Sequence, residues 1–346
     1  MKHHTYQSNS QRGTSLTIWF AVLTCLTLFL FMVDLCIGDT HISVTKVWAS
    51  LTGGECDEIT RNIILHIRLT RVVVAGLVGM ALSVSGLQMQ TVFRNPLADP
   101  YLLGVSSGTG LGVALFILGA PLLGLSGYSF LHTAGIVGCG WIGAFCVMLL
   151  IMGVSARVKN ILAVLIMGVM LGYVVGAVIQ IMQYTSTAEQ LKLYTLWSMG
   201  SLNNVTTLQL AIMAPVVCLS IGLSAISVKP LNILLLGTIY AQTMGLRIKR
   251  ARTWVFITTT LLAGTVSAFC GPIGFIGLAI PHITKALIKR ANHGVLLPAC
   301  VLTGICGMLL CDIVSKSFQL PVNCVTALTG VPVIVWVTIK NLRKIE

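Results

Sequence analysis

Long apolar stretches recur along the whole chain, and they restrict its fold more than any other feature. A helix needs about 20 apolar residues to cross the roughly 30 Å hydrocarbon core of a bilayer. Stretches of this length, such as 16–36 and 161–183, are separated by short polar breaks. No polar block is long enough to fold separately. The sequence therefore predicts an all-α membrane protein with a single transmembrane domain over residues 1–346.

The charge content supports the same fold class. Charged residues make up 9% of the 346 residues, and hydrophobic residues make up 56%. A soluble domain carries about 25% charged residues. So few charges cannot cover a water-facing surface of this size, so most of the surface must face lipid. Two or three soluble domains, which the length alone would allow, are excluded.

Ten candidate spans can be placed. They are 16–36, 69–93, 101–120, 130–153, 161–183, 206–227, 254–270, 274–290, 295–315 and 325–340. The first is interpreted as a retained span, because it is too long for the apolar part of a typical signal peptide and no small-residue cleavage site clearly follows it.

The basic residues give the predicted orientation. With the N-terminus inside and ten spans, 16 of the 22 Lys and Arg residues fall on the cytoplasmic side. Those on the other side are Lys46, Arg61, Arg68, Arg71, Lys192 and Lys316. Among the acids, only Asp99 and Glu346 fall inside. This distribution follows the positive-inside rule and predicts that both termini are cytoplasmic.

The net charge of +13 and the eleven cysteines have simple interpretations. The basic residues lie in breaks between apolar segments, which favours membrane orientation over nucleic-acid binding. No two cysteines form a C-x-x-C pair, and most lie inside apolar runs, as small buried hydrophobic residues do. No metal and no cofactor is expected.

Glycine is abundant, with 34 residues, and many lie inside the predicted spans. Small residues allow helices to approach closely in lipid, where packing drives helix association. Gly104, Gly108, Gly110 and Gly112 form one such series. We expect a structural role for them.

Two proline-containing breaks interrupt the apolar pattern, at 94–100 and at 271–282. Proline cannot continue a helix, and the backbone groups it frees need partners. Each break is either a tight turn or a segment lining a transport path. Both contain Leu-Ala-x-Pro, at Leu97–Pro100 and Leu278–Pro281. The offset of five spans predicts two inverted-topology-like halves of a transporter.

The source of energy is constrained by what the sequence lacks. There is no G-x-x-x-x-G-K-[ST] motif for nucleotide phosphates and no hydrolytic set of residues. The acids within spans are few, and Asp34 and Asp312 both fall near an outer membrane edge. An ion-coupled carrier usually keeps ionisable groups near mid-membrane. A secondary carrier acting alone and a membrane-embedded enzyme remain alternatives, and this pattern disfavours both.

A series of motifs extends from about residue 60 to the end of the chain. They are Arg68-Leu-Thr-Arg71, Ser85-Gly86, Arg94-Asn-Pro-Leu-Ala-Asp-Pro100, Leu103-Gly-Val-Ser106, Trp197-Ser-Met-Gly-Ser-Leu202, Gly271-Pro-Ile-Gly-Phe-Ile-Gly-Leu278, Pro281-His282, Leu297-Pro298, Asp312-Ile-Val314, Leu320-Pro-Val322 and Thr326-Ala-Leu-Thr-Gly-Val-Pro332. In this order they resemble the FecCD-type (BtuC-like) permeases of bacterial ABC importers for iron-siderophores, haem and vitamin B12.

The resemblance implies the architecture and the partners. It implies a type II ABC importer permease with ten helices per subunit, which forms a homodimer in the bacterial inner membrane. It also implies two cytoplasmic ATP-binding subunits and an external substrate-binding protein. The permease itself would not be an enzyme. The substrate would be an iron chelate (siderophore or haem) or cobalamin, and the sequence does not choose among them.

Three basic residues correspond to positions that dock the binding protein in such permeases. They are Arg68, Arg71 and Lys316. Basic residues are otherwise rare on the predicted outer side, which favours docking over snorkelling to lipid headgroups. The chain departs from the family at Thr70, where proline is usual, and at Lys316, where arginine is usual. Lysine offers a point charge in place of a two-pronged donor, so we expect a weaker contact there.

Two further residues correspond to the inner gate of the family. They are Asn95 and Leu97, whose side chains would narrow the cytoplasmic end of the path. A simple turn role for the asparagine is the competing interpretation.

The basic connection 230–252 corresponds to the region that couples the permease to its ATPase. It is expected to contain short helices, although a basic anchor for anionic lipid is the plainer interpretation. The matching positions are Gly237, Ala241, Gly245 and Leu246. Relatives often carry acidic residues after the equivalent of Gly237, where this chain has Thr-Ile-Tyr at 238–240. We therefore expect an ATPase with a less basic groove.

Overall fold

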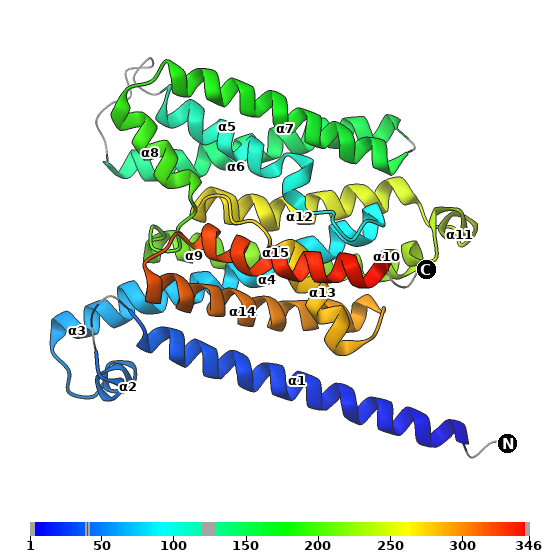
Figure 1. Ribbon diagram of the computed structural model, residues 1–346, viewed down its shortest axis with the longest axis horizontal. Coiled ribbons are helices and arrows are strands. Elements are labelled where there is room, and N and C mark those ends of the chain that lie inside the picture. The colour runs from blue at the N-terminus through cyan, green and yellow to red at the C-terminus, as the bar shows by residue number, and fades with distance from the viewer. Residues whose placement is uncertain (1–3, 39, 41, 120–128, 159, 343–346) are drawn as a thin grey trace.

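The computed structural model describes residues 4–38, 40, 42–119, 129–158 and 160–342. Within these ranges the secondary structure is helical, and the long helices run side by side along one direction (Figure 1). The helices are α1 (His4–Cys36), α2 (Val44–Thr52), α3 (Glu58–Asn62), η1 (Ile63–Arg68), α4 (Leu69–Phe93), η2 (Pro100–Leu103), α5 (Val105–Ile117), α6 (Ser129–Arg157), α7 (Ile161–Tyr184), α8 (Ala188–Ser198), α9 (Thr207–Ile226), α10 (Val228–Leu235), α11 (Thr238–Thr243), α12 (Ile248–Cys270), α13 (Ile276–Ile288), α14 (His293–Phe318) and α15 (Val322–Leu342).

Seven of the described helical segments are long and apolar enough to cross a membrane. They are Leu16–Cys36, Glu58–Phe93, Ala134–Arg157, Ile161–Tyr184, Thr207–Ile226, Ile248–Cys270 and His293–Phe318. Each contains or overlaps one predicted span. The other predicted spans correspond to the shorter apolar helices Val105–Ile117, Ile276–Ile288 and Val322–Trp336. The all-α membrane fold is confirmed, and the shorter helices make the count of ten approximate.

Helix α4 forms the centre of the bundle. In the span that contains it, 89% of the most apolar window is buried inside the protein, against 11% for α1 and 22% for both α7 and α9. It packs against α9, α12, α13 and α14. A helix that is apolar on every side needs such surroundings. Helices α1, α7 and α9 instead expose most of their apolar surface, as lipid-facing helices do.

Glycines allow the closest helix contacts, as the sequence predicted. A Cβ atom on Gly112 of α5 would lie 1.9 Å from the carbonyl oxygen of Cys139 in α6. A Cβ on Gly86 of α4 would lie 1.9 Å from the carbonyl oxygen of Gly277 in α13. Real atoms cannot approach so closely, so these helices meet only because the side chains are absent. Gly104 differs, because its φ of +79° places it in the turn between η2 and α5.

The short helices gather at the two ends of the bundle. Figure 1 shows α2, α3 and α8 at one end, which is called the α2 end below, and α10 and α11 at the other, the α10 end. The first described residues of α1 and the last of α15 lie at the α10 end (Figure 1). The two chain ends therefore share one side of the bundle, as an even number of spans requires.

The two Leu-Ala-x-Pro segments differ in structure. Leu97 and Ala98 lie in the non-helical segment before η2, whereas Leu278–Pro281 lies within α13. The backbone break of the second region occurs earlier, at 271–275, where Gly271 and Phe275 have φ of +75° and +69°. The break therefore ends at Phe275, close to the start of the predicted span 274–290, and the helix that begins at Ile276 accommodates Pro281 in its second turn.

Candidate functional site

Four charged side chains form a buried cluster at the α2 end. Arg71 Nη2 lies 2.7 Å from Asp312 Oδ1, and Arg71 Nε lies 3.0 and 3.1 Å from the two carboxylate oxygens. Lys316 Nζ lies 3.0 Å from the other oxygen of Asp312 and 2.8 Å from Asp34 Oδ1. Three helices, α1, α4 and α14, thus meet at these ion pairs.

The cluster is balanced in charge and shielded from solvent. Two cations face two carboxylates, and the side chains of Arg71, Lys316, Asp312 and Asp34 are 13%, 2%, 0% and 0% exposed. Asp312 and Lys316 stand four residues apart on one face of α14, so helix geometry sets the contact between these two side chains. Removing ions from water is expensive, and only such close pairing compensates for it.

Arg68 lies beside this cluster but has a different set of partners. Its Nη1 donates to the carbonyl oxygens of Leu35 (3.3 Å) and Cys36 (2.9 Å), and Nη2 donates to the carbonyl of Thr40. These carbonyls belong to the last turn of α1 and the residues that follow it. A guanidinium there satisfies free carbonyls and complements the negative end of the helix dipole. Arg68 therefore fastens the end of α1 to the start of α4.

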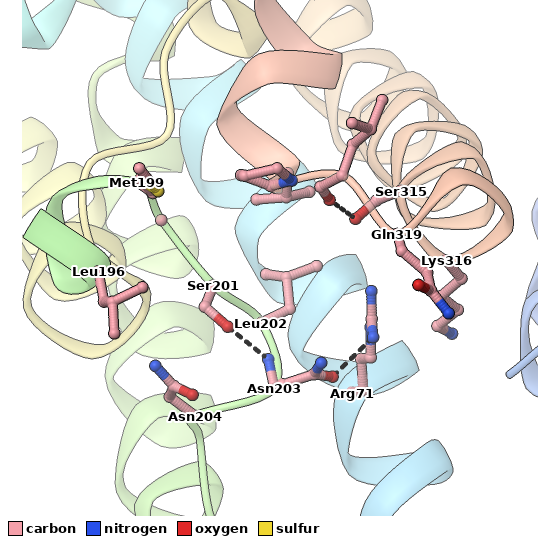
Figure 2. A pocket seen from close by; sticks show the side chains of 14 residues that line it. Arg71, Leu196, Met199, Ser201, Leu202, Asn203, Asn204, Ser315, Lys316 and Gln319 are labelled. Carbon is pink, nitrogen blue, oxygen red and sulfur yellow. Dashed lines mark hydrogen bonds between the residues drawn. The ribbon is translucent and has the colours of Figure 1, made fainter. Parts of the chain in front are cut away.

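A cavity of about 520 Å³ opens beside Arg71 and Lys316. Figure 2 shows Asn203, Asn204 and Ser201 on one side of it and Ser315 and Gln319 on the other. Asn203 Oδ1 accepts a 2.7 Å hydrogen bond from Arg71 Nη1 (Figure 2). The polar lining is mostly neutral, because the two cations are compensated by acids behind them.

The structure brings all three predicted docking residues together. Arg71 and Lys316 line the larger cavity, and both also line, with Arg68, an adjoining space of about 210 Å³ near Thr40. The docking role itself stays a prediction. Sequence reasoning missed their partners Asp34 and Asp312. Both acids were predicted near the outer membrane edge, where the three bases were also predicted. This shared position was the one indication in the sequence that acids and bases could pair.

The two predicted gate residues lie in the turn that follows α4. Asn95 Oδ1 accepts a 2.9 Å hydrogen bond from the backbone N–H of Leu97, and the Asn95 carbonyl accepts from Ala98 N–H at 3.1 Å. The asparagine therefore performs the turn role that competed with gating. Leu97 is 43% exposed. Arg94, with φ of +50°, ends α4 and starts the turn. Gating stays a prediction.

This turn is held against α13 and lies close to the α10 end helices. His282 Nε2 donates to the carbonyl oxygen of Pro96 at 2.8 Å, and Lys285 Nζ donates to Gln90 Oε1 at 3.1 Å. A Cβ on Gly237 would lie 3.7 Å from Arg94 Nη1. The predicted gate and the predicted coupling segment are thus neighbours in space, although they are far apart in sequence.

The coupling segment contains two short helices, as predicted. Gly237 has φ of +107° and precedes α11, and Gly245 has φ of +79° and follows it. Both values favour glycine. Ala241 is fully buried, and its carbonyl accepts a 2.9 Å hydrogen bond from the N–H of Leu246. Gly237, Ala241 and Leu246 therefore shape and seat α11, whereas Gly245 is exposed. The coupling role of the four positions stays a prediction, and further residues of α10 and α11 are exposed beside them.

Those other residues form an exposed apolar surface. They are Leu235, Leu236, Ile239, Tyr240 and Met244, with exposures between 44% and 79%. Large exposed apolar patches mark sites of interaction. As for metals, no group of three His, Cys, Asp or Glu side chains within the described ranges is arranged to hold an ion.

Known proteins resemble this chain over nearly its whole length. The vitamin B12 import system permease protein BtuC of Citrobacter koseri is 35% identical over 332 residues, covering 94% of this chain and 95% of the relative. The protein of the same name from Salmonella newport is 36% identical, covering 94% and 96%.

Solved structures share the fold. An inward-facing conformation of a metal-chelate type ABC transporter superposes with a TM-score of 0.81 at 29% identity, covering 94% of this chain and 99% of that one. PsaBC from Streptococcus pneumoniae in complex with Fab has a TM-score of 0.50 at 16% identity, covering 85% and 94%, and shares the fold alone. The model of the FecCD transport family matches residues 26–340. This chain is therefore a multi-pass membrane permease of a bacterial ABC importer and belongs to the FecCD transport family.

Proposed function

We propose that this permease imports a large metal chelate of the vitamin B12 type. The observation that carries the proposal is the 35–36% identity to vitamin B12 permeases over 94% of the chain. The resemblance to a metal-chelate transporter favours a second candidate, an iron chelate. Two copies of the chain would enclose one path. The single domain over 1–346 would contain all the spans of one copy, and 230–252 its coupling region.

The cavity at the α2 end supports an amide-rich substrate. Its neutral amides and hydroxyls, from Ser201, Asn203, Asn204 and Gln319, can donate to and accept from amide groups. A substrate with several carboxylates would need uncompensated cations instead. Arg71 and Lys316 are already paired with acids. This favours a cobalamin over a polyanionic chelate.

Docking of an external binding protein would use the exposed side of the same cavity. Arg71 Nη1 donates to Asn203, whose amide is neutral. A carboxylate from the partner could take this position. Hydrogen bonds between ionised groups are roughly twice as strong as those between neutral groups. In this proposal Arg71 makes the contact, Lys316 holds Asp312 behind it, and Arg68 keeps the rim in place through α1.

Energy would come from two ATPase subunits bound at the α10 end. The exposed apolar residues of α10 and α11 are the proposed contact, with Ile239 and Tyr240 at its centre, 79% and 64% exposed. The turn with Asn95 and Leu97 lies beside them through Arg94 and Gly237. Movement of α11 could therefore reach the inner end of the path directly.

The deciding experiment is ligand-stimulated ATP hydrolysis by the assembled complex in liposomes. Cobalamin, haem and ferric siderophores would be offered with their binding proteins, and cobalamin is expected to stimulate hydrolysis and uptake. Stimulation by an iron chelate alone would favour the second candidate. Uptake driven by an ion gradient without the ATPase would overturn both and restore the secondary-carrier alternative.

Docking has its own test in the Arg71→Gln variant. Binding-protein affinity, measured by surface plasmon resonance on permease in nanodiscs, is expected to fall about tenfold, the loss of roughly 1.4 kcal/mol. Lys192→Gln is the matched control, because Lys192 is an exposed base on α8 at the same end. Equal affinity of both variants and the wild type would exclude Arg71 from docking.

A further inference from the structure

Helix α2 differs from the long described helices in direction. Figure 1 shows it nearly end-on, at the end of a bundle whose long helices run across the view. It begins eight residues after α1 ends at Cys36, and it precedes the span that begins at Glu58. It therefore lies where two spans leave the hydrocarbon core. Its nine residues are far too few to cross a bilayer.

One side of α2 is fixed to the protein. Val47 and Ser50 are 1% and 3% exposed, and Val47 joins the main hydrophobic core. Ser50 Oγ also donates to Cys56 Sγ at 3.3 Å. Gly53, with φ of +80°, ends the helix and turns the chain back. The helix is thus a fixed part of the fold.

A second side carries an exposed apolar stripe, which none of the residues that the structure describes covers. Val44, Trp48 and Leu51 follow at the i, i+4, i+7 spacing that places residues along one helix face. They are 66%, 60% and 37% exposed. Helix α2 packs against α1, α3 and η1, the elements that lead into the two spans beside it.

The opposite side of α2 is polar. Lys46 stands two residues from both Val44 and Trp48, and residues two apart on a helix point to nearly opposite sides. Its ammonium lies 3.7 Å from the Asp57 carboxylate, and both side chains are more than half exposed. The helix thus has one face packed on the protein, one exposed apolar face and one exposed polar face.

We propose that α2 lies in the bilayer surface, with Val44, Trp48 and Leu51 inserted at the boundary between headgroups and acyl chains. Short amphipathic helices bind membranes in this way, and tryptophan is enriched at that depth. The helix packs beside the ends of the two spans that flank it, which makes lipid the occupant of its exposed apolar stripe. The bilayer surface would then set the height of Arg68 and the charged cluster beside it, whatever the substrate is.

Fluorescence of Trp48 in proteoliposomes tests the insertion. The chain has six tryptophans, so the Trp48 signal is taken as the difference between wild type and Trp48→Phe. Lipids brominated near the headgroup are expected to quench most of this difference signal. Lipids brominated near the chain ends should quench it less, and aqueous iodide should leave it nearly unchanged.

A matched control moves the indole to the polar face of the same helix. Lys46→Trp in the Trp48→Phe background should be quenched by iodide and spared by brominated lipid. If the Trp48 signal is quenched by iodide and protected only when the binding protein is added, the stripe is a protein-docking surface and the proposal fails. If neither quencher reaches Trp48, a second copy covers the stripe, and the proposal fails as well.

Discussion

At the scale of single residues, the paired charges at the α2 end join three spans. Asp312 contacts both Arg71 and Lys316, and Asp34 contacts Lys316 from α1. From the sequence, Arg68, Arg71 and Lys316 were predicted to lie on the outer side, where basic residues are rare. All three were interpreted as docking residues for an external binding protein. Sequence reasoning could not find the internal acids, because ion pairing across 241 or 282 residues depends on how the helices pack.

Asp312→Asn is expected to destabilise the permease strongly. It would leave two buried cations with one carboxylate, and removing one partner of a buried pair costs about 3–5 kcal/mol. The measurement is thermal unfolding in detergent. The double variant Asp34→Leu with Lys316→Met removes one charge of each sign and leaves the Arg71–Asp312 pair intact, so it should lose less. A double variant that unfolds as early as Asp312→Asn would refute the balanced-charge account.

Asp99 is expected to make the protein less stable as the pH rises. A typical acid of a folded protein has a lowered pKa and does the reverse. Asp99 lies in the turn before η2, where its Oδ1 accepts from Tyr101 N–H at 2.8 Å, and burial raises the pKa of its carboxyl to about 6. A raised pKa in the folded state means that this group contributes stability below about pH 4, which is lost as the pH rises through about 6.

The Asp99→Asn variant isolates this contribution. Asparagine can keep the acceptor for Tyr101 but carries no charge, so it should be more stable than wild type at pH 8, by on the order of 1–3 kcal/mol. The difference should shrink toward pH 4. Thermal unfolding of both proteins across this range is the measurement. A stability difference that is the same at every pH would show that ionisation of Asp99 is not its cause.

At the scale of helices, close backbone contact decides which spans are neighbours. Apolar periodicity cannot predict partners for α4, because it is apolar on every side. Glycine positions carry more information. Gly79 meets Gly304 of α14 and Gly86 meets Gly277 of α13, so one glycine-bearing helix packs directly against two others. The sequence indicated that glycines would allow close packing, but not which pairs would meet, since that needs the three-dimensional register of the helices.

Gly86→Ala tests this packing. The added methyl group would overlap the Gly277 carbonyl, and overpacking a rigid contact typically costs about 1–3 kcal/mol. Gly222→Ala in α9 is the control, since a Cβ there meets nothing within 4 Å. Alanine in an exposed helix position stabilises by up to about 1 kcal/mol. Thermal unfolding that ranks the two variants the other way round would contradict the close contact.

At the scale of the whole molecule, composition and periodicity predicted the fold class, because lipid imposes a simple requirement on every span. The ten predicted ranges match helices of the structure, and the short helices of 230–252 appear where expected. The helix boundaries near proline and the short helices between spans were less predictable. The helix containing Leu278–Pro281 continues through its proline, although Pro281 lies in the second turn and has no N–H to donate to the carbonyl of Gly277. The interfacial helix α2 was missed because nine residues give too short an apolar pattern.

The direction of the bundle in the membrane is predicted from charge. The first described residues of α1 and the last of α15 lie at the α10 end, whereas α2 and α3 lie at the other (Figure 1). Arg247, Lys249 and Arg250 lie at the start of α12, which follows α11 directly in the chain. Basic segments close to spans are retained in the cytoplasm. A fluorescent protein that matures only in the cytoplasm, fused after Glu346, is therefore expected to fluoresce, and alkaline phosphatase fused there to be inactive. An epitope inserted at Gly54, between α2 and α3, serves as the internal control and should be labelled from outside intact spheroplasts. The opposite pattern would place the charged cluster in the cytoplasm, where an external binding protein could not reach Arg71, and would remove the physical basis for import in this direction.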